Sequence, residues 1–174
     1  MEPNPTHSAS PEVIKDHFVH HLNRVYYGKK YLYKHLPDLN ELSSFKKLKQ
    51  GLQEVWEDVG KQVKRIQKIY DLLDAQPAPE NCVPIIAVFK DAFEPQEYEV
   101  ETCLLNDIDI ILYLQLLEHI NITSYRMLKI LAGTLGHAEV EQLLLESLDE
   151  SSDNDKLFVM IADEYVERGI KSIS

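Results

Sequence analysis

The chain has little cysteine, little glycine and no long uncharged apolar stretch. Its 174 residues include two cysteines, Cys82 and Cys103, and no Cys-x-x-Cys pair. Two cysteines cannot make a disulfide framework, so we expect a reduced, cytoplasmic protein in which both are small buried or loop residues. The longest apolar stretch, residues 108–117, contains Asp109 and has about half of the ~20 residues that a membrane-spanning helix needs. For this reason we expect no membrane partner, and residues 1–12 lack the basic-then-apolar order of a signal peptide.

Basic residues are scarce as well. The chain has 18 Lys and Arg against 29 Asp and Glu, which gives a formal net charge of −11. Because binding to nucleic acid needs surplus cations to neutralise phosphates, no nucleic-acid partner is expected. The charge is uneven: residues 1–75 carry a net +2 and residues 76–174 a net −13. Two interpretations stay open: solvated helix faces, or two halves that pack together, within one chain or across a dimer, through complementary potentials.

The signature motifs of several enzyme classes are missing. The sequence has no glycine-rich phosphate loop, no Gly-x-Ser-x-Gly and no Cys/His nucleophile arrangement. Strand-like alternation is nearly absent, and helical spacing dominates instead. Ser10, Pro11 and Glu12 predict the start of a first helix, which we expect Pro37 to end. Spacings of three and four predict its inward stripe, which comprises Ile14, Phe18, Leu22, Val25, Lys29, Leu32 and Leu36.

Two further long helices and a short one follow this first helix. The second helix is predicted at residues 42–73 and the short helix at residues 83–93. The third begins near residues 99–104, and Gly133 and Gly136 mark its end. Its middle is apolar on most sides, which is typical of a central, buried helix.

The fourth long helix is predicted at residues 139–166. Its middle, residues 149–155, has the sequence DESSDND and is polar enough to break the helix locally. Helical spacing nevertheless places one line of residues inward: Val140, Leu144, Ser147, Ser151, Asn154, Phe158, Ile161 and Tyr165.

Together these elements predict an all-α fold, a ferritin-like four-helix bundle. Two long hairpins would be joined by a crossover, residues 74–100, that contains the short helix. The bundle would cover residues 10–168, with an N-terminal tail at residues 1–9 and a C-terminal tail at residues 169–174.

Four segments carry a family resemblance. They are RVYYGKKYLYKHLP (24–37), QVKRIQKIYDLLDAQP (62–77), LLEHINITSYRMLKILAGTLGH (116–137) and EQLLLESLDE (141–150). In order and spacing they resemble the bacterial YciE/YciF-like family of ferritin-like proteins over residues 13–166. The resemblance implies a stress-associated role, a dimer, and a carboxylate- and histidine-rich site between the four helices, similar to the di-iron centre of ferritin-like oxidases.

The family's ligand positions are only partly kept on the first two helices. In the first helix the family pattern resembles Asp-Ala-Glu-Lys-Gln-Leu, and this chain has Tyr-Gly-Lys-Lys-Tyr-Leu, so Lys29 stands where the ligand Glu would be. In the second the pattern resembles His-x-x-Glu-Thr. The histidine has become Val55 and the glutamate a shorter Asp58.

The third and fourth helices show the same partial loss. The pattern resembles Glu-His-x-Glu on the third helix, where Glu118 and His119 remain and Asn121 replaces the second glutamate. On the fourth it resembles Leu-Asp-Glu-Glu-Lys, where Glu150 matches and Ser151 replaces the next glutamate. We expect Asp58 and Glu118 to face inward. Glu150 is one step off the inward line and is expected to face outward.

A di-metal site normally has about six protein ligands, and these positions do not supply them. The favoured hypothesis is therefore a non-catalytic structural or interaction protein that has lost its metal centre and holds no cofactor. One alternative is a divergent di-iron or di-manganese oxidase that uses Asp58, Glu118, Glu150 and His119. Another is a module that binds a single metal ion with a remnant of the site.

Two side chains are predicted to take the place of the metal ions, and one histidine cluster is set aside. A buried ammonium at Lys29 needs an anion, for which Asp58 and Glu118 are the candidates; the alternative is that Lys29 extends its ammonium group into water. Trp56 is expected to be mostly buried and to help fill the space of the metal site. A third group, His17, His20 and His21, has spacing that can hold zinc or nickel, but without a second ligand-rich segment we expect a solvated patch.

Overall fold

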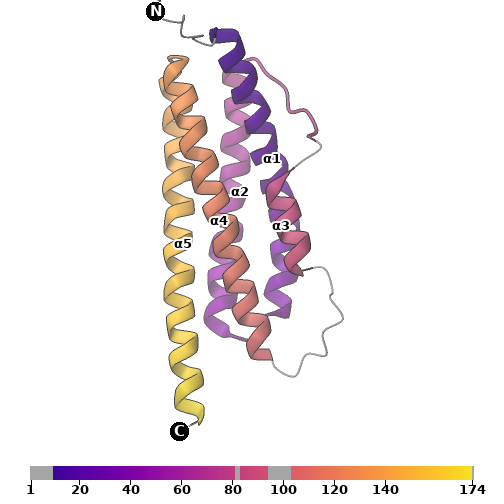
Figure 1. Cartoon of the computed structure of the whole chain (residues 1–174), viewed down its shortest axis with the longest axis vertical. Helices are drawn as coiled ribbons and strands as arrows, with labels where there is room; N and C mark the ends of the chain where they lie inside the picture. Colours follow the sequence, from indigo (N-terminus) through magenta and orange to yellow (C-terminus); the bar gives the residue numbers. More distant parts are fainter. Residues whose placement is uncertain (1–9, 81–82, 94–102, 174) are drawn as a thin grey trace, which may run out of the picture.

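Two long helical hairpins form the molecule, which the computed structural model shows as an elongated bundle (Figure 1). The first hairpin consists of α1 (Pro11–Leu42) and α2 (Lys46–Leu72), and the second of α4 (Cys103–Thr134) and α5 (Ala138–Ile173). The short helix α3 (Pro84–Phe93) lies between them in the chain and packs on the outside of α1 and α4. The structure describes residues 10–80, 83–93 and 103–173.

The predicted all-α bundle with a short helix in the crossover is confirmed. The two hairpins pack through α1 against α4 and α2 against α5. The helix bounds agree with the prediction to within a few residues, except that α1 continues beyond Pro37 and α5 remains helical to Ile173, past residue 168. The predicted N-terminal tail at residues 1–9 and the position of Cys82 lie outside the described residues.

Two helix ends were recognised correctly from the sequence. The Ser10 hydroxyl oxygen accepts a hydrogen bond from the Val13 amide at 3.3 Å and caps α1. Gly136 follows α4 with a φ of 73°, a left-handed conformation that L side chains rarely adopt. Gly133 was also expected at this helix end, but it lies within the last turn of α4.

Pro37 does not end α1, contrary to the prediction, and the helix continues to Leu42. A proline inside a helix removes the amide that would bond the carbonyl four residues earlier, here that of Tyr33. The indole Nε1 of Trp56 on α2 donates to the Tyr33 carbonyl oxygen at 3.0 Å and supplies the missing hydrogen bond. The first hairpin therefore compensates for the proline, an interaction between residues 23 positions apart in the sequence.

The polar segment at residues 149–155 does not break α5, so that expectation is wrong. Neighbouring hydroxyl groups bond to the preceding turn of the same helix: Ser147 donates to the Leu143 carbonyl at 3.1 Å and Ser152 to the Leu148 carbonyl at 2.8 Å. Hydroxyl groups bonded in this way are compatible with a continuous helix. The predicted inward line of α5 is confirmed, because each of its residues is buried.

Polar side chains divide the apolar core into two clusters. Along each long helix, the residues of one cluster lie on one side of this polar layer and those of the other cluster lie on the other side. Leu36 and Leu114 belong to one cluster, and Leu22 and Leu128 belong to the other. Burying polar groups without hydrogen-bond partners costs free energy, so apolar packing does not explain why these side chains are in the core. The polar layer consists of Lys29, Gln62, Glu118, Asn121, Ser147, Ser151 and Asn154.

Complementary charges join the two hairpins. Basic residues of α2 pair with acidic residues of α5, as in Lys68 with Glu139 at 2.8 Å and Lys47 with Glu164. Arg65 of α2 reaches two glutamates of α5. The near-neutral first half and the acidic second half of the sequence therefore meet within one chain, which confirms the intramolecular form of that interpretation.

The third long helix, α4, is less buried than its composition predicts. One face carries large apolar side chains that are exposed. Within the described residues, no helix is both long and apolar enough to cross a membrane. The exposed apolar residues of α4 are Ile108, Leu112, Leu116, Met127 and Ile130.

Candidate functional site

Lys29 lies at the centre of the polar layer. The inward stripe of α1 places it between buried apolar neighbours, and it has 0% exposure. Its Nζ is 3.9 Å from Oε2 of Glu118 on α4 and 5.7 Å from the centre of the Tyr125 ring. The prediction that Lys29 is buried against Glu118 is confirmed, and the alternative that it reaches water is wrong.

The α4 side of the site consists of residues spaced one turn apart. The Asn121 side-chain amide donates to Oε2 of Glu118 at 3.0 Å, so this carboxylate oxygen is shared between the amide and the ammonium of Lys29. The Tyr125 hydroxyl donates to Oε1 of Gln62 on α2 at 3.2 Å. Glu118 is 2% exposed, which confirms its predicted inward position.

The site reaches the surface through α2 and α5. The Gln62 amide donates to Oε2 of Glu150 at 3.2 Å. Arg65 forms a two-pronged pair with the same carboxylate, with Nη1 and Nη2 each 2.6 Å from an oxygen, and its Nε donates to Glu146 at 3.1 Å. The expectation that Glu150 faces outward is wrong, because its side chain is 22% exposed and is held by Arg65 and Gln62.

Asp58 is not the partner of Lys29. Its side chain is 21% exposed and accepts from Lys61 Nζ at 2.7 Å, one turn along α2. An aspartate side chain is shorter than the glutamate of the family pattern, so at this partly exposed position it bonds more easily to Lys61 on its own helix than to Lys29 on α1. Asp58 thus acts on Lys29 only through the longer-range field of its charge.

Burial dominates the electrostatics of the site. Desolvation lowers the pKa of Lys29, while the negative charges of Glu118, Glu150 and Asp58 act in the opposite direction. Burial also raises the pKa of the Tyr125 hydroxyl well above its usual value, again with the glutamates contributing. The fully buried part of the site therefore contains one amino group, that of Lys29, whose charged form is favoured only by the neighbouring carboxylates, and a tyrosine whose protonated form is favoured by burial.

The remaining positions of the family's site carry neutral groups. Val55 is 2% exposed and packs in the core, and Ser151 on α5 is fully buried. Within the described residues, no hydrogen-bond partner is found for Lys29 Nζ, Asn121 Oδ1, Ser151 Oγ or Asn154 Nδ2. Buried donors and acceptors that lie close together without protein partners favour the binding of small polar molecules such as water.

Trp56 and His119 lie away from the polar layer. The Trp56 indole is partly buried and stacks on the exposed Tyr33 ring, with ring centres 5.0 Å apart, so the prediction that it fills the metal space is wrong. The reason is its bond to the Tyr33 carbonyl, which holds the indole at the outer edge of the α1–α2 hairpin. His119 is 67% exposed, and its Nε2 is 3.3 Å from Asp155 on α5.

The histidines of α1 take different partners in the structure, although the His20 and His21 rings meet edge-on with centres 5.1 Å apart. His20 lies 3.1 Å from Glu80, whereas His17 and His21 line a groove beside α4. Among the residues that the structure describes, no group of three or more His, Cys, Asp or Glu side chains is arranged to hold a metal ion.

Gln62, Arg65 and Tyr125 were missed from the sequence, although the signal was present. Gln62 lies three residues after Val59 and four before Ile66, which puts it on the inward line of α2. Tyr125 follows Asn121 by four residues on the same face of α4. Their hydrogen bonds could not have been predicted, because these depend on how the helices are rotated against each other.

Comparison with known proteins places the chain in a family. The sequence model of Domain of unknown function (DUF892) matches residues 13–171. The chain belongs to the DUF892 family. It is 30% identical to Protein YciF of Escherichia coli (strain K12) over 145 residues, which cover 83% of this chain and 87% of YciF. The expected resemblance to the YciE/YciF-like proteins is therefore confirmed.

Solved structures show the fold of this DUF892 member. The crystal structure of the E. coli stress protein YciF matches with a TM-score of 0.82 and 29% identity, covering 88% of this chain and 97% of that one. YcfI from Rhodopseudomonas palustris matches with a TM-score of 0.78, 27% identity and the same coverage. Dps from Thermosynechococcus elongatus, at 13% identity and a TM-score of 0.66 over 88% of this chain and 95% of its own, shares the fold alone. The bundle is thus ferritin-like, as predicted.

Proposed function

We propose that this protein is a non-catalytic member of its family in which a lysine-centred polar network has replaced a di-metal centre. The observation that carries the proposal is Lys29, a fully buried ammonium 3.9 Å from the Glu118 carboxylate. Two like charges repel strongly where the surroundings are weakly polar, so a metal ion beside this ammonium would be destabilised. The protein would then act as a structural or interaction component, and YciF, described as a stress protein, supports a stress-associated role.

The donor set around Lys29 does not fit a di-iron or di-manganese centre. Iron and manganese prefer carboxylate and imidazole ligands. Glu118 and Glu150 are the carboxylates that belong to the network, and Glu150 is already neutralised by Arg65. Asn121 and Ser151 offer only neutral oxygens, and Val55 offers none. No catalytic step through a metal is therefore assigned.

The metal content of the purified protein tests this proposal. Protein expressed without a His tag, in medium supplemented with iron and manganese, is expected to contain well below one equivalent of either metal by elemental analysis. Lys29→Glu alone is expected to remain at the same background, because Val55, Asn121 and Ser151 still lack carboxylate or imidazole groups.

Two results would contradict the proposal. Two equivalents of iron or manganese per chain would favour the divergent oxidase that uses Asp58, Glu118, Glu150 and His119. About one equivalent of a metal ion that a chelator removes, without oxidase activity, would favour a module that keeps a remnant of the site.

We also propose a homodimer, the commonest symmetric assembly. Three exposed apolar residues, Ile108, Leu112 and Leu116, repeat every four positions on the first half of α4 and so share one face. Contiguous exposed apolar surface of this kind marks interaction sites. Complementary surface charges would add to the contact and make it sensitive to salt.

Light scattering at low and high salt tests the assembly. The wild-type chain is expected to have twice the monomer mass at micromolar concentration, with a lower average mass at high salt. Leu112→Glu, on the 49% exposed α4 residue, is expected to give a monomer, whereas Met160→Glu, on a 66% exposed residue of α5, is expected to leave the mass unchanged. A monomeric wild-type protein under both conditions would overturn the proposal.

A further inference from the structure

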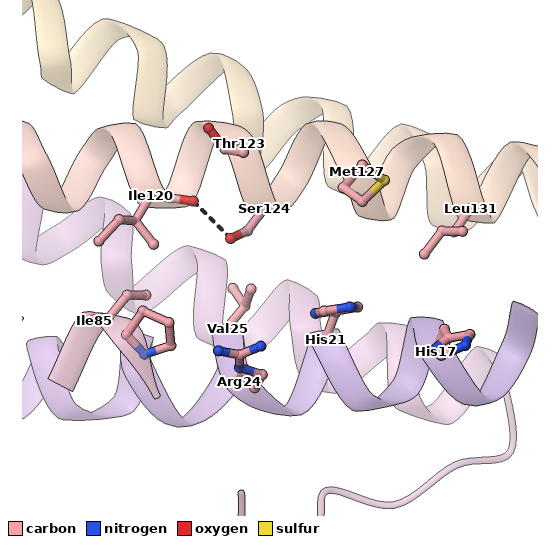
Figure 2. Close-up of a pocket in the computed structure, with 11 residues that line it drawn as sticks. His17, His21, Arg24, Val25, Ile85, Ile120, Thr123, Ser124, Met127 and Leu131 are labelled. Carbon is pink, nitrogen blue, oxygen red and sulfur yellow. Dashed lines mark hydrogen bonds between the residues drawn. The ribbon is translucent and has the colours of Figure 1, made fainter. Parts of the chain in front are cut away.

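A groove of about 550 Å³ lies between α1, α3 and α4, and none of the polar-layer residues lines it (Figure 2). Its walls are mostly apolar, with Val25 from α1, Ile85 from α3, and Ile120, Met127 and Leu131 from α4. Figure 2 shows the α1 and α4 side chains on opposite sides of the space. This volume lies within the ~300–1,000 Å³ typical of small-molecule sites.

Close packing of α3 forms one end of the groove. A Cβ atom at Gly28 of α1 would lie 2.6 Å from Cδ1 of Ile85, so glycine at this position allows α3 to approach α1 closely. Ile85 is 2% exposed and is therefore a fixed part of the wall. The groove is thus built by the fold of one chain and does not depend on a partner.

Basic groups gather on the α1 wall. His17, His21 and Arg24 follow at spacings of four and three, and all three line the groove. Glu80, in the segment that follows α2, accepts from the His20 ring and the Asn23 amide at 3.1 and 3.2 Å. A basic lining is notable in a chain with a net charge of −11.

The charges on this wall act on one another. Burial lowers the pKa of His21, and the charges of His20, Arg24 and His17 lower it further, whereas Glu80 raises it. An anion bound beside His21 would act in the same direction as Glu80 and favour the protonated form of this imidazole. An apolar space with several basic groups on one wall is complementary to a molecule with an apolar body and one negative end.

We propose that this groove binds a small amphipathic carboxylate, such as a medium-chain fatty acid. The carboxylate meets Arg24 and His21, which are one turn apart on α1, and the hydrocarbon chain lies along Met127 and Leu131 of α4 (Figure 2). A nucleotide or sugar fits less well, because the α4 wall offers few polar groups for its many hydroxyls. The inference is independent of the proposed loss of the metal centre, which concerns other residues.

Calorimetric titration with decanoate, below its micelle concentration, tests the charge requirement. Decanoate is expected to bind saturably, and decyltrimethylammonium, with the same chain and the opposite charge, at least tenfold more weakly. Arg24→Gln is expected to weaken decanoate binding by roughly tenfold, which is about 1.4 kcal/mol. Lys34→Gln, on an exposed lysine of α1 outside the groove, is the matched control and is expected to change nothing.

A second pair of variants tests the location without changing charge. Met127 and Met160 are 51% and 66% exposed, so tryptophan at either position is tolerated by the fold, and melting temperatures check this. Met127→Trp fills the groove and is expected to abolish decanoate binding. Met160→Trp, on α5, is expected to keep it.

Three outcomes would overturn the inference. The first is equal affinity for decanoate and decyltrimethylammonium, or decanoate binding that survives Met127→Trp. The second is a wild-type dimer that binds no decanoate and dissociates with Met127→Trp, because a second copy would then cover the groove. The third is co-sedimentation with phosphatidylcholine vesicles without saturable binding of free decanoate, which would assign the groove to a lipid surface.

Discussion

Lys29→Met is expected to lower the free energy of unfolding by about 3–5 kcal/mol, because it leaves the Glu118 carboxylate buried without its cation. Among the residues that the structure describes, Glu118 would keep one hydrogen bond, from Asn121, and would have no cation within 4 Å. Chemical denaturation followed by circular dichroism measures the loss. Lys34→Met, on an exposed lysine of the same helix, is the matched control and is expected to change stability by less than about 0.5 kcal/mol.

The double variant Lys29→Met/Glu118→Gln separates the ion pair from simple packing. Replacing both members of a buried pair by neutral groups is often nearly neutral in stability. We therefore expect the double variant to recover most of the loss, since the glutamine oxygen can still accept from Asn121. If the losses in the free energy of unfolding caused by Lys29→Met and by Glu118→Gln simply add in the double variant, the two side chains do not interact and the account is wrong.

The pH dependence of stability provides a separate readout of Lys29. Because burial lowers its pKa in the folded protein, the unfolded chain binds more protons between that lowered pKa and the usual value of 10.5. The free energy of unfolding from this group therefore rises with pH across that interval. Lys29→Met is expected to remove this rise. Measurements should stop near pH 10, because the unfolded chain then ionises Tyr125, whose raised pKa keeps it protonated in the fold and reverses the slope.

Asp107→Ala is expected to lower the free energy of unfolding by about 3 kcal/mol, through loss of a buried acceptor for several donors. Asp107 is fully buried at the start of α4, where it accepts from the Ser43 hydroxyl at 2.8 Å, the Ser44 amide at 3.0 Å and the Ser44 hydroxyl. These bonds tie the α1–α2 turn to the second hairpin. Denaturation measures the loss, and local hydrogen exchange is expected to be faster at the turn.

Asp109 offers the matched control for this prediction. It lies two residues further along α4, carries the same carboxylate and is exposed, so Asp109→Ala is expected to change stability by less than about 0.5 kcal/mol. Asp107→Asn keeps one acceptor oxygen and is expected to fall between wild type and Asp107→Ala. Equal stability of the two alanine variants would show that the contact with Ser43 and Ser44 contributes nothing.

The sequence alone was sufficient for the four long helices, the short crossover helix and the inward position of Lys29. Apolar residues spaced by three and four define each buried face, and that pattern depends only on the geometry of a helix. The same pattern placed Ser147 and Ser151 inward, whereas the inward position of Glu118 was expected from the family resemblance. Which face of a helix becomes buried follows from the sequence of that helix, so no knowledge of the neighbouring helices is needed.

Contacts between helices required the tertiary structure. Pro37 inside α1 is tolerated because Trp56, on another helix, bonds the carbonyl that the proline leaves free. Glu150 turned toward the site because Arg65 and Gln62 of α2 lie opposite it. Asp58 pairs with Lys61 of its own helix rather than with Lys29, an outcome of competition between two possible partners. Each outcome depends on the relative rotation and spacing of two helices, or on competition between partners, which the spacing of residues in a single helix does not fix.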